Sequence, residues 1–108
     1  MSLLHVVLLS FEPELGDAEV EELHAQVRTW PEAIGGFEQL ALGAPLFTER
    51  ARGYHWMLQI VAPDADALER YQVHPVHQRF AAWTREHGVT VLAFDYVLDA
   101  STVLVGRG

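Results

Sequence analysis

The chain of 108 residues has the length of one domain, and half of its residues are hydrophobic, which is enough for a packed core. A formal net charge of −8, with seven basic residues that are all arginine, argues against a nucleic-acid-binding protein. The lack of cysteine excludes a disulfide framework and a zinc–thiolate site. No apolar run reaches the roughly 20 residues that span a bilayer, and the first residues do not read as a signal peptide, so we expect a cytoplasmic protein.

Residues 3–11 alternate with the two-residue period of a β-strand, and both faces of this strand are mainly apolar. His5 and Phe11 fall on one face, whereas Leu4 and Leu8 fall on the other. A half-exposed strand would carry polar residues on one face. We therefore expect this strand to be covered on both sides, either by its own chain or by a partner.

A helix is predicted to follow, with Asp17 as its N-cap residue and Gly35-Gly36 as its stop. Its apolar residues recur at spacings of three and four, which marks one buried stripe made of Val20, Leu23, Val27, Trp30 and Ile34. Pro31 falls near the end of this helix. A second, less regular strand is predicted from Phe37 to about Leu46, ending at Pro45.

Residues 54–62 form the next predicted strand, with Trp56 and Leu58 on one face and His55 on the other. A helix that opens at residues 63–66 is predicted to end at the His74-Pro75 junction, because proline disfavours helical geometry in the residue before it. Since proline suits the first turn of a helix, a new helix is expected from Pro75 to Gly88.

The last strand is predicted over residues 89–98, and the tail of residues 101–108 has a β-prone stretch at 102–105. This tail would be either an extra edge strand or an arm to another subunit, and the sequence does not decide between them. The order β-α-β-β-α-α-β predicts an α+β fold of the ferredoxin-like type, with helices on one face of a four-stranded antiparallel sheet. The other face would be bare and apolar, which predicts a symmetric homodimer through that face.

The junction at residues 71–77 concentrates the side chains that can perform chemistry. His77 falls in the opening turn of the second helix, where the positive end of the helix dipole favours a neutral imidazole that can accept a proton. Tyr71 supplies a phenol that stays protonated near neutral pH. From the residues alone, an acid–base pair and a purely structural junction both remain open.

Several of these segments resemble the stress-responsive dimeric α/β-barrel (Dabb) family. They are the opening segment 4–11, Gly53-Tyr54 before a strand, the Tyr71…His74-Pro75-Val76-His77 junction and the closing segment 91–96. The resemblance covers about residues 3–98 and assigns a Dabb domain to residues 1–100. It implies a homodimer in which two sheets pack into an α+β barrel.

The resemblance also implies roles for individual residues. A plant polyketide cyclase of this type uses a histidine–tyrosine pair that matches His77 and Tyr71, and its histidine on the first strand matches His5. A further pocket histidine of that enzyme falls at Trp56 in this chain. The resemblance therefore implies His77 as a base and Tyr71 as a proton donor, in a cyclase-like or lyase-type reaction that needs no cofactor.

An apolar pocket between sheet and helices is expected to bind the ligand, and its predicted lining comprises His5, Trp56, Leu58, Phe80 and Trp83. Each aromatic or aliphatic member of this set is also typical of an ordinary core, which is the more common role for any one of them. His74 and His77 have a spacing that metal ligands can have, but no carboxylate accompanies them on a matching face, so we expect no metal site.

The sequence thus leaves two functional hypotheses. In the first, the chain is a cofactor-independent enzyme that binds a small apolar or aromatic carbonyl compound and acts through His77 and Tyr71. In the second, it is a non-catalytic, stress-associated homodimer that binds small molecules or has a structural role. Both hypotheses expect association with a second copy of the chain, and neither expects nucleic acid or a membrane as a partner.

Overall fold

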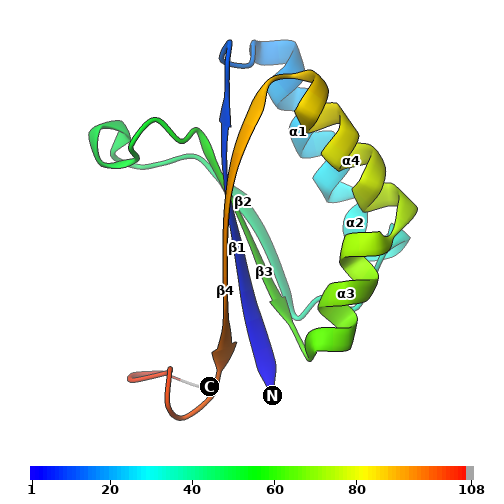
Figure 1. The fold of residues 1–108 in the computed structure, drawn as a ribbon, viewed down its shortest axis with the longest axis vertical. Coiled ribbons are helices and arrows are strands. Elements are labelled where there is room, and N and C mark those ends of the chain that lie inside the picture. The colour runs from blue at the N-terminus through cyan, green and yellow to red at the C-terminus, as the bar shows by residue number, and fades with distance from the viewer. Residues whose placement is uncertain (107–108) are drawn as a thin grey trace.

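The computed structural model describes residues 1–106, which fold into one sheet and a layer of helices (Figure 1). The strands are β1 (Ser2–Phe11), β2 (Gln39–Gly43), β3 (Trp56–Ala62) and β4 (Val89–Leu98). The helices are α1 (Asp17–Arg28), α2 (Trp30–Ala33), α3 (Ala65–Val73) and α4 (Pro75–Glu86), and a 3-10 turn, η1 (Thr48–Arg50), precedes β3. The predicted bounds of the last strand and the break between α3 and α4 are confirmed.

The four strands lie in the order β2-β3-β1-β4, and every neighbouring pair is antiparallel. This is the ferredoxin-like arrangement that the order of elements predicted. The central strand β1 pairs with both β3 and β4, so that His5 lies between Ile60 on one side and Asp95 on the other. This register places a histidine and a carboxylate next to each other on the same face of the sheet.

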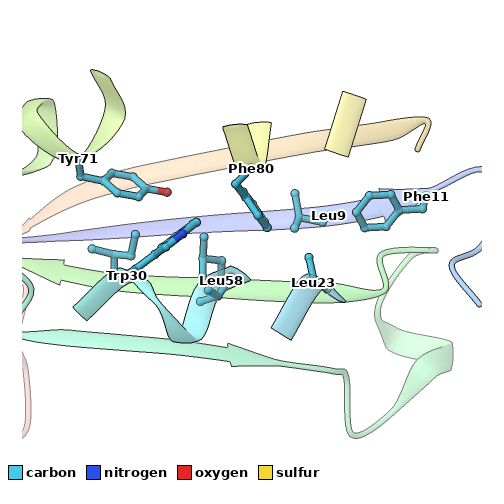
Figure 2. Packing of buried hydrophobic residues seen from close by; sticks show 9 residues of the cluster. Leu9, Phe11, Leu23, Trp30, Leu58, Tyr71 and Phe80 are labelled. Carbon is cyan, nitrogen blue, oxygen red and sulfur yellow. The ribbon is translucent and has the colours of Figure 1, made fainter. Parts of the chain in front are cut away.

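The helices cover one face of the sheet and leave the other face open (Figure 1). On the covered face, side chains from β1 and β3 meet side chains from the helices in one apolar core (Figure 2). Its buried members are Leu9, Phe11, Leu23, Val27, Trp30, Leu58, Ile60, Tyr71 and Phe80. The open face carries large hydrophobic side chains that remain exposed, namely Met57, Leu92, Phe94 and Tyr96. As predicted, the face covered by the helices and the open face of the sheet both carry apolar side chains.

The first helix differs from its prediction at both ends. Gly16, and not Asp17, is the N-cap residue, because the Glu19 carboxylate accepts the Gly16 N–H at 2.6 Å and Asp17 already belongs to the first turn. The predicted single helix to Ile34 is broken at Thr29 into α1 and α2. Pro31 explains the break, because it has no N–H to donate to the carbonyl of Val27.

Two further boundaries are corrected. The predicted strand from Phe37 to Leu46 is shorter, since only Gln39–Gly43 pairs with β3. Phe37 instead packs against the core, with its ring centroid 5.7 Å from that of Tyr71. In the tail, residues 99–106 form turns and bends and no strand, with the Asp99 carbonyl accepting the N–H groups of Thr102 and Val103. The last two residues of the predicted tail lie outside the described range.

Gly88 illustrates why α4 ends where it does. Its φ of +73° is a left-handed conformation that glycine adopts without strain. A side chain at this position would also collide with the backbone of Glu12, because a Cβ atom would lie only 2.3 Å from the Glu12 carbonyl oxygen. The Gly88 carbonyl accepts the Glu12 N–H at 3.1 Å, which ties the end of α4 to the end of β1.

Candidate active site

The junction between α3 and α4 is built by His74 and Pro75. His74 has an extended backbone, as expected for the residue before a proline, and its Nδ1 accepts the N–H of Val76 at 3.1 Å. His74 is therefore the N-cap of α4, and Pro75 is the first residue of that helix. This arrangement places His77 in the first turn, near the positive end of the helix dipole.

Tyr71 lies at the end of α3 and is only 2% exposed. Aromatic rings enclose it: the ring centroid of His77 is 4.3 Å away, that of Trp30 is 5.4 Å away and that of His5 is 5.9 Å away. Burial raises the pKa of the Tyr71 phenol well above its usual range. The phenol is therefore protonated at neutral pH and can donate a hydrogen bond but cannot act as a base.

His77 is only partly buried, and one of its two ring nitrogens is fixed by the backbone. Its Nδ1 lies 3.0 Å from the carbonyl oxygen of Gln72. Since a carbonyl can only accept, Nδ1 carries the hydrogen and donates it. In the neutral imidazole the lone pair is then on Nε2, which is the atom that can take up a proton.

The electrostatic surroundings of His77 favour this neutral form. Burial lowers the pKa of the His77 imidazole below its ordinary value, the hydrogen bond to Gln72 acts in the opposite direction, and the nearby His5 lowers it further. At neutral pH, His77 is therefore a base that is ready to accept a proton, beside a phenol that is ready to donate one. The geometry thus brings together the two residues that the sequence predicted as a pair.

His5 forms the third polar member of this cluster. It is buried in the middle of β1, and its Nδ1 donates to the Asp95 carboxylate on the neighbouring strand β4. Asp95 itself is about half exposed, with 48% of its side chain accessible. The pair therefore connects the buried cluster to solvent along β4 and leaves Nε2 of His5 free for another partner.

The other predicted pocket residues are spread along the core. Leu58 and Phe80 are buried within it, and the Phe80 ring lies 5.0 Å from that of Trp30 (Figure 2). Trp56 pairs with Leu9, four residues along β1 from His5, and its ring contacts His24 at 4.9 Å. Trp83 contacts His87, with 4.3 Å between the ring centroids. Phe80 thus adjoins the cluster, whereas Trp56 and Trp83 lie toward the opposite end of the sheet.

Two hollows lie away from the cluster. The larger, about 680 Å³, lies between the open face of the sheet and the segment that connects β2 to β3; its lining includes Leu8, Phe47, Tyr54, Trp56, Met57 and Leu92. The second, about 450 Å³, is lined partly by Leu15, Val20, His55 and Trp56. Neither lining contains His5, Tyr71 or His77. The larger hollow is lined mainly by apolar residues.

His55 lies outside β3, which begins at Trp56 and not at residue 54 as predicted. Its Nδ1 accepts the N–H of Phe11 at 3.1 Å. Two residues of the cluster were missed by the sequence analysis. Asp95 carried a usable signal, because it is the one carboxylate within the apolar strand β4. Trp30 was recognised only as part of a buried stripe, and nothing in the pattern separated its indole from ordinary core.

Within residues 1–106, no group of three histidine or acidic side chains converges in a way that would hold a metal ion. In the same range, no helix has the length and the apolar character needed to cross a membrane.

Comparisons with known proteins agree with the fold. The profile of the family described as Stress responsive A/B Barrel Domain matches residues 3–98. Olivetolic acid cyclase from Cannabis sativa is 23% identical over 97 residues, which cover 89% of this chain and 96% of the cyclase.

Two solved structures are also similar. Hydroxynitrile lyase from Passiflora edulis has a TM-score of 0.79 at 13% identity, covering 92% of this chain and 94% of the lyase. A dimeric ferredoxin-like protein of unknown function from Thermobifida fusca has a TM-score of 0.78 at 23% identity, covering 91% and 92% of the two chains.

Proposed function

Because this chain belongs to the stress responsive A/B barrel domain family, we propose that it is a homodimeric, cofactor-independent acid–base enzyme. Its substrate would be a small apolar or aromatic carbonyl compound bound between the sheet and the helices. His77 would act as the base and Tyr71 as the hydrogen-bond donor, in a cyclase-like or lyase-type reaction.

One observation carries the proposal: a histidine with a fixed tautomer lies against a protonated tyrosine. The hydrogen bond from His77 Nδ1 to Gln72 leaves Nε2 as the basic atom, and the His77 and Tyr71 rings are 4.3 Å apart. Burial lowers the pKa of the His77 imidazole, so this base is neutral at neutral pH.

The pair suits proton abstraction next to a carbonyl group. Nε2 of His77 would take a proton from the carbon beside the carbonyl, and the electron pair would move to the oxygen, which accepts a hydrogen bond from Tyr71. In a cyclisation, the resulting carbon nucleophile would attack a second carbonyl carbon of the same molecule, and protonated His77 would return its proton to the new alkoxide. General acid–base catalysis by one placed group contributes typically about 10²–10⁴-fold.

The remaining cluster residues would position the ligand. The His5 ring centroid lies 5.9 Å from that of Tyr71, and Nε2 of His5, which the hydrogen bond to Asp95 leaves free, would bind a second oxygen of the substrate. Leu58 and Phe80 would contact the apolar part close to the carbonyl. Trp56 and Trp83, which lie farther along the core, would contact only the distal end of a longer ligand.

The similar proteins support an enzyme without identifying its reaction. One is a cyclase and another is a lyase, and both cover nearly the whole of this chain. At 13% identity, the likeness to the lyase concerns the fold alone. The proposal therefore rests on the side chains of this cluster.

The proton-abstraction step can be tested without knowledge of the natural substrate. In D₂O, a base that removes a methyl proton of acetophenone and returns deuterium exchanges the methyl group, which ¹H NMR follows directly. We expect the protein to catalyse this exchange, and His77→Ala to lower the catalysed rate by about 10²–10⁴-fold.

The matched control for this test is His87→Ala. His87 lies just after α4. Like the Nδ1 of His77, its Nδ1 donates to a backbone carbonyl, in this case that of Trp83. Its ring contacts Trp83 and is not among the rings that enclose Tyr71. This variant should exchange acetophenone at the wild-type rate. Equal rates for wild type and His77→Ala, with both proteins folded, would remove His77 from the proposed role.

The non-catalytic alternative also has an observation in its favour. Tyr71 is buried, and neither large hollow reaches it or His77. In this alternative, the apolar hollow of about 680 Å³ would bind a hydrophobic molecule or a protein surface, and the cluster would only stabilise the junction. A protein that binds acetophenone but does not exchange its methyl protons would favour this alternative.

The dimeric state is part of the proposal. The open face of the sheet exposes large apolar side chains, whose association in water is favourable, and the similar protein from Thermobifida fusca is dimeric. Two such faces related by a two-fold axis would bury each other.

A further inference from the structure

Trp30 adjoins Tyr71 and His77 of the cluster. It is the first residue of α2, and its side chain is completely buried. Its backbone carbonyl accepts the N–H of Ile34 at 2.9 Å and that of Gly35 at 3.1 Å, and Pro31 fixes the next residue. The backbone of Trp30 is therefore held in the short helix α2 by two hydrogen bonds.

The indole nitrogen of Trp30 is a hydrogen-bond donor without an acceptor. Among residues 1–106, only two buried side-chain nitrogen or oxygen atoms lack a partner, Nε1 of Trp30 and Nε2 of Gln26. An indole N–H can only donate, so it cannot be satisfied by another donor. Buried polar groups are nearly always paired in native proteins, so an unpaired one indicates an absent partner.

The surroundings of this nitrogen indicate where such a partner would lie. The Trp30 ring is 5.4 Å from that of Tyr71 and 5.8 Å from that of His77. Figure 2 shows the Tyr71 hydroxyl directed into the core, toward Phe80. The part of the Trp30 ring that carries the indole nitrogen extends toward the same part of the core. The rings that carry the two donors and the base are therefore direct neighbours.

We propose that the indole N–H of Trp30 is a second hydrogen-bond donor to the carbonyl oxygen of the ligand, beside the Tyr71 hydroxyl. The inference rests on the proposed function and narrows its ligand class. A carbonyl oxygen has two lone pairs and can accept from both residues at once, whereas an apolar isostere satisfies neither. Charge that develops on this oxygen during proton abstraction is stabilised by both donors.

A competing explanation is local. The Trp30 and Phe80 rings are nearly perpendicular, at 88°, with centroids 5.0 Å apart, so the N–H could be directed at the face of the Phe80 ring. The two explanations predict opposite NMR shifts. A proton held over an aromatic face moves upfield, and a proton that donates to an oxygen moves downfield.

The test uses ¹⁵N-labelled wild-type protein and two probes of nearly equal shape. Acetophenone has the carbonyl oxygen, and α-methylstyrene has a CH₂ group in its place. The chain contains three tryptophans, so the Trp30 indole signal is assigned from its loss in Trp30→Phe. If that variant does not fold, Trp56→Phe and Trp83→Phe give the same assignment by elimination.

We expect saturating acetophenone to move the Trp30 N–H signal downfield and to slow its exchange with D₂O, while α-methylstyrene causes no downfield shift. Trp30→Phe should weaken the binding of acetophenone by roughly three- to tenfold and leave the binding of α-methylstyrene unchanged.

The other outcomes separate this inference from the proposed function. In one outcome, acetophenone shifts the ring signals of His77 but leaves the Trp30 N–H signal unmoved or moves it upfield. This result would contradict the role of Trp30 as a second donor and would leave the proposed acid–base pair in place. Equal downfield shifts of the Trp30 N–H signal with acetophenone and with α-methylstyrene would also contradict the role of Trp30 as a donor to the carbonyl oxygen. If neither probe shifts any signal of the cluster, both the ligand site and the second donor are overturned.

Discussion

The polar cluster at the α3–α4 junction and the apolar hollow beside the β2–β3 connection are two very different regions of one small domain. The cluster joins two histidines, a tyrosine and a tryptophan, and the ring centroids in each contact described above lie within 6 Å of each other. The hollow encloses about 680 Å³, yet its lining contains no histidine and no carboxylate. Space and chemistry therefore lie in different places.

In this protein, the volume of a hollow and the presence of an acid–base pair therefore point to different regions. A hollow on the open face of a sheet forms wherever a loop projects beyond the strands, and a partner subunit would change its shape. A histidine base has a fixed tautomer only when one ring nitrogen is held by a nearby acceptor. In His77 this acceptor is the Gln72 carbonyl oxygen, 3.0 Å from Nδ1. We propose that the chemistry takes place in the cluster and that the dimer forms through the open face.

The largest expected effect concerns stability and contrasts two phenylalanines. Phe80 is buried beside Trp30, so Phe80→Ala should lower the free energy of unfolding by about 3–5 kcal/mol. Phe47 lines the hollow and is about half exposed, so Phe47→Ala should change it by less than about 1 kcal/mol. Urea denaturation of both variants measures the difference, and similar losses would contradict the separation of core and hollow.

The next effect concerns catalysis and contrasts two tyrosines. Tyr71→Phe removes only the hydroxyl, and it should lower the catalysed exchange of acetophenone by about 10²–10³-fold, as the loss of a donor to a developing oxyanion does. Tyr54→Phe makes the same change in the lining of the hollow and should leave the rate unchanged. A loss in Tyr54→Phe that matches the loss in Tyr71→Phe would move the chemistry to the hollow.

A third effect concerns association through the open face. Phe94 is 67% exposed on this face, so Phe94→Asp would introduce a charge into the proposed interface. We expect the dissociation constant of the dimer to rise by at least about 30-fold, which light scattering after size exclusion detects. Asp66→Asn, on the exposed surface of α3, changes charge away from the interface and should leave the dimer intact.

The smallest effect is the dependence on pH. Burial lowers the pKa of His77, so the base should lose activity only when the pH falls below about 6.5, the ordinary value for histidine. Above that pH the exchange rate should be level into the alkaline range, because the pKa of Tyr71 is raised. A rate that keeps rising between pH 7 and pH 9 would indicate a different base.

The same shift has a consequence for stability. Unfolded His77 has the ordinary pKa, whereas the folded form has a lower one, so the unfolded chain binds more protons as the pH falls below about 6.5. The contribution of this group to stability is therefore lost as the pH falls from about 6.5 through the pKa of the folded form. His77→Gln should reduce this acid sensitivity in thermal unfolding between pH 7 and pH 5.

Much of the fold was predictable because its signals are local. The alternation in β1 and β4 and the proline between His74 and Val76 determine their elements almost without tertiary context. The break of the first helix at Thr29 and the short strand β2 were not predicted. The break has a local cause, the missing N–H of Pro31, although the sequence analysis placed this proline only near the helix end. The length of β2 depends on how Phe37 packs against the core, which the pattern of one segment does not contain.

The candidate site was predictable only in part for a similar reason. His77 and Tyr71 are six residues apart across one junction, so sequence distance already places them together. His5 and Asp95 are 90 residues apart and meet only through the register of β1 against β4. The unpaired nitrogen of Trp30 depends on the packing of several rings, and no sequence pattern encodes such a contact.

The most direct test of the central claim is a crystal structure of the protein with bound acetophenone. We predict that the ligand lies in the cluster, with its oxygen at a hydrogen-bonding distance of about 2.6–3.0 Å from the Tyr71 hydroxyl and its methyl group facing Nε2 of His77. Acetophenone found only in the hollow between β3 and the β2–β3 connection, with Tyr71 and His77 still packed against each other, would contradict the account.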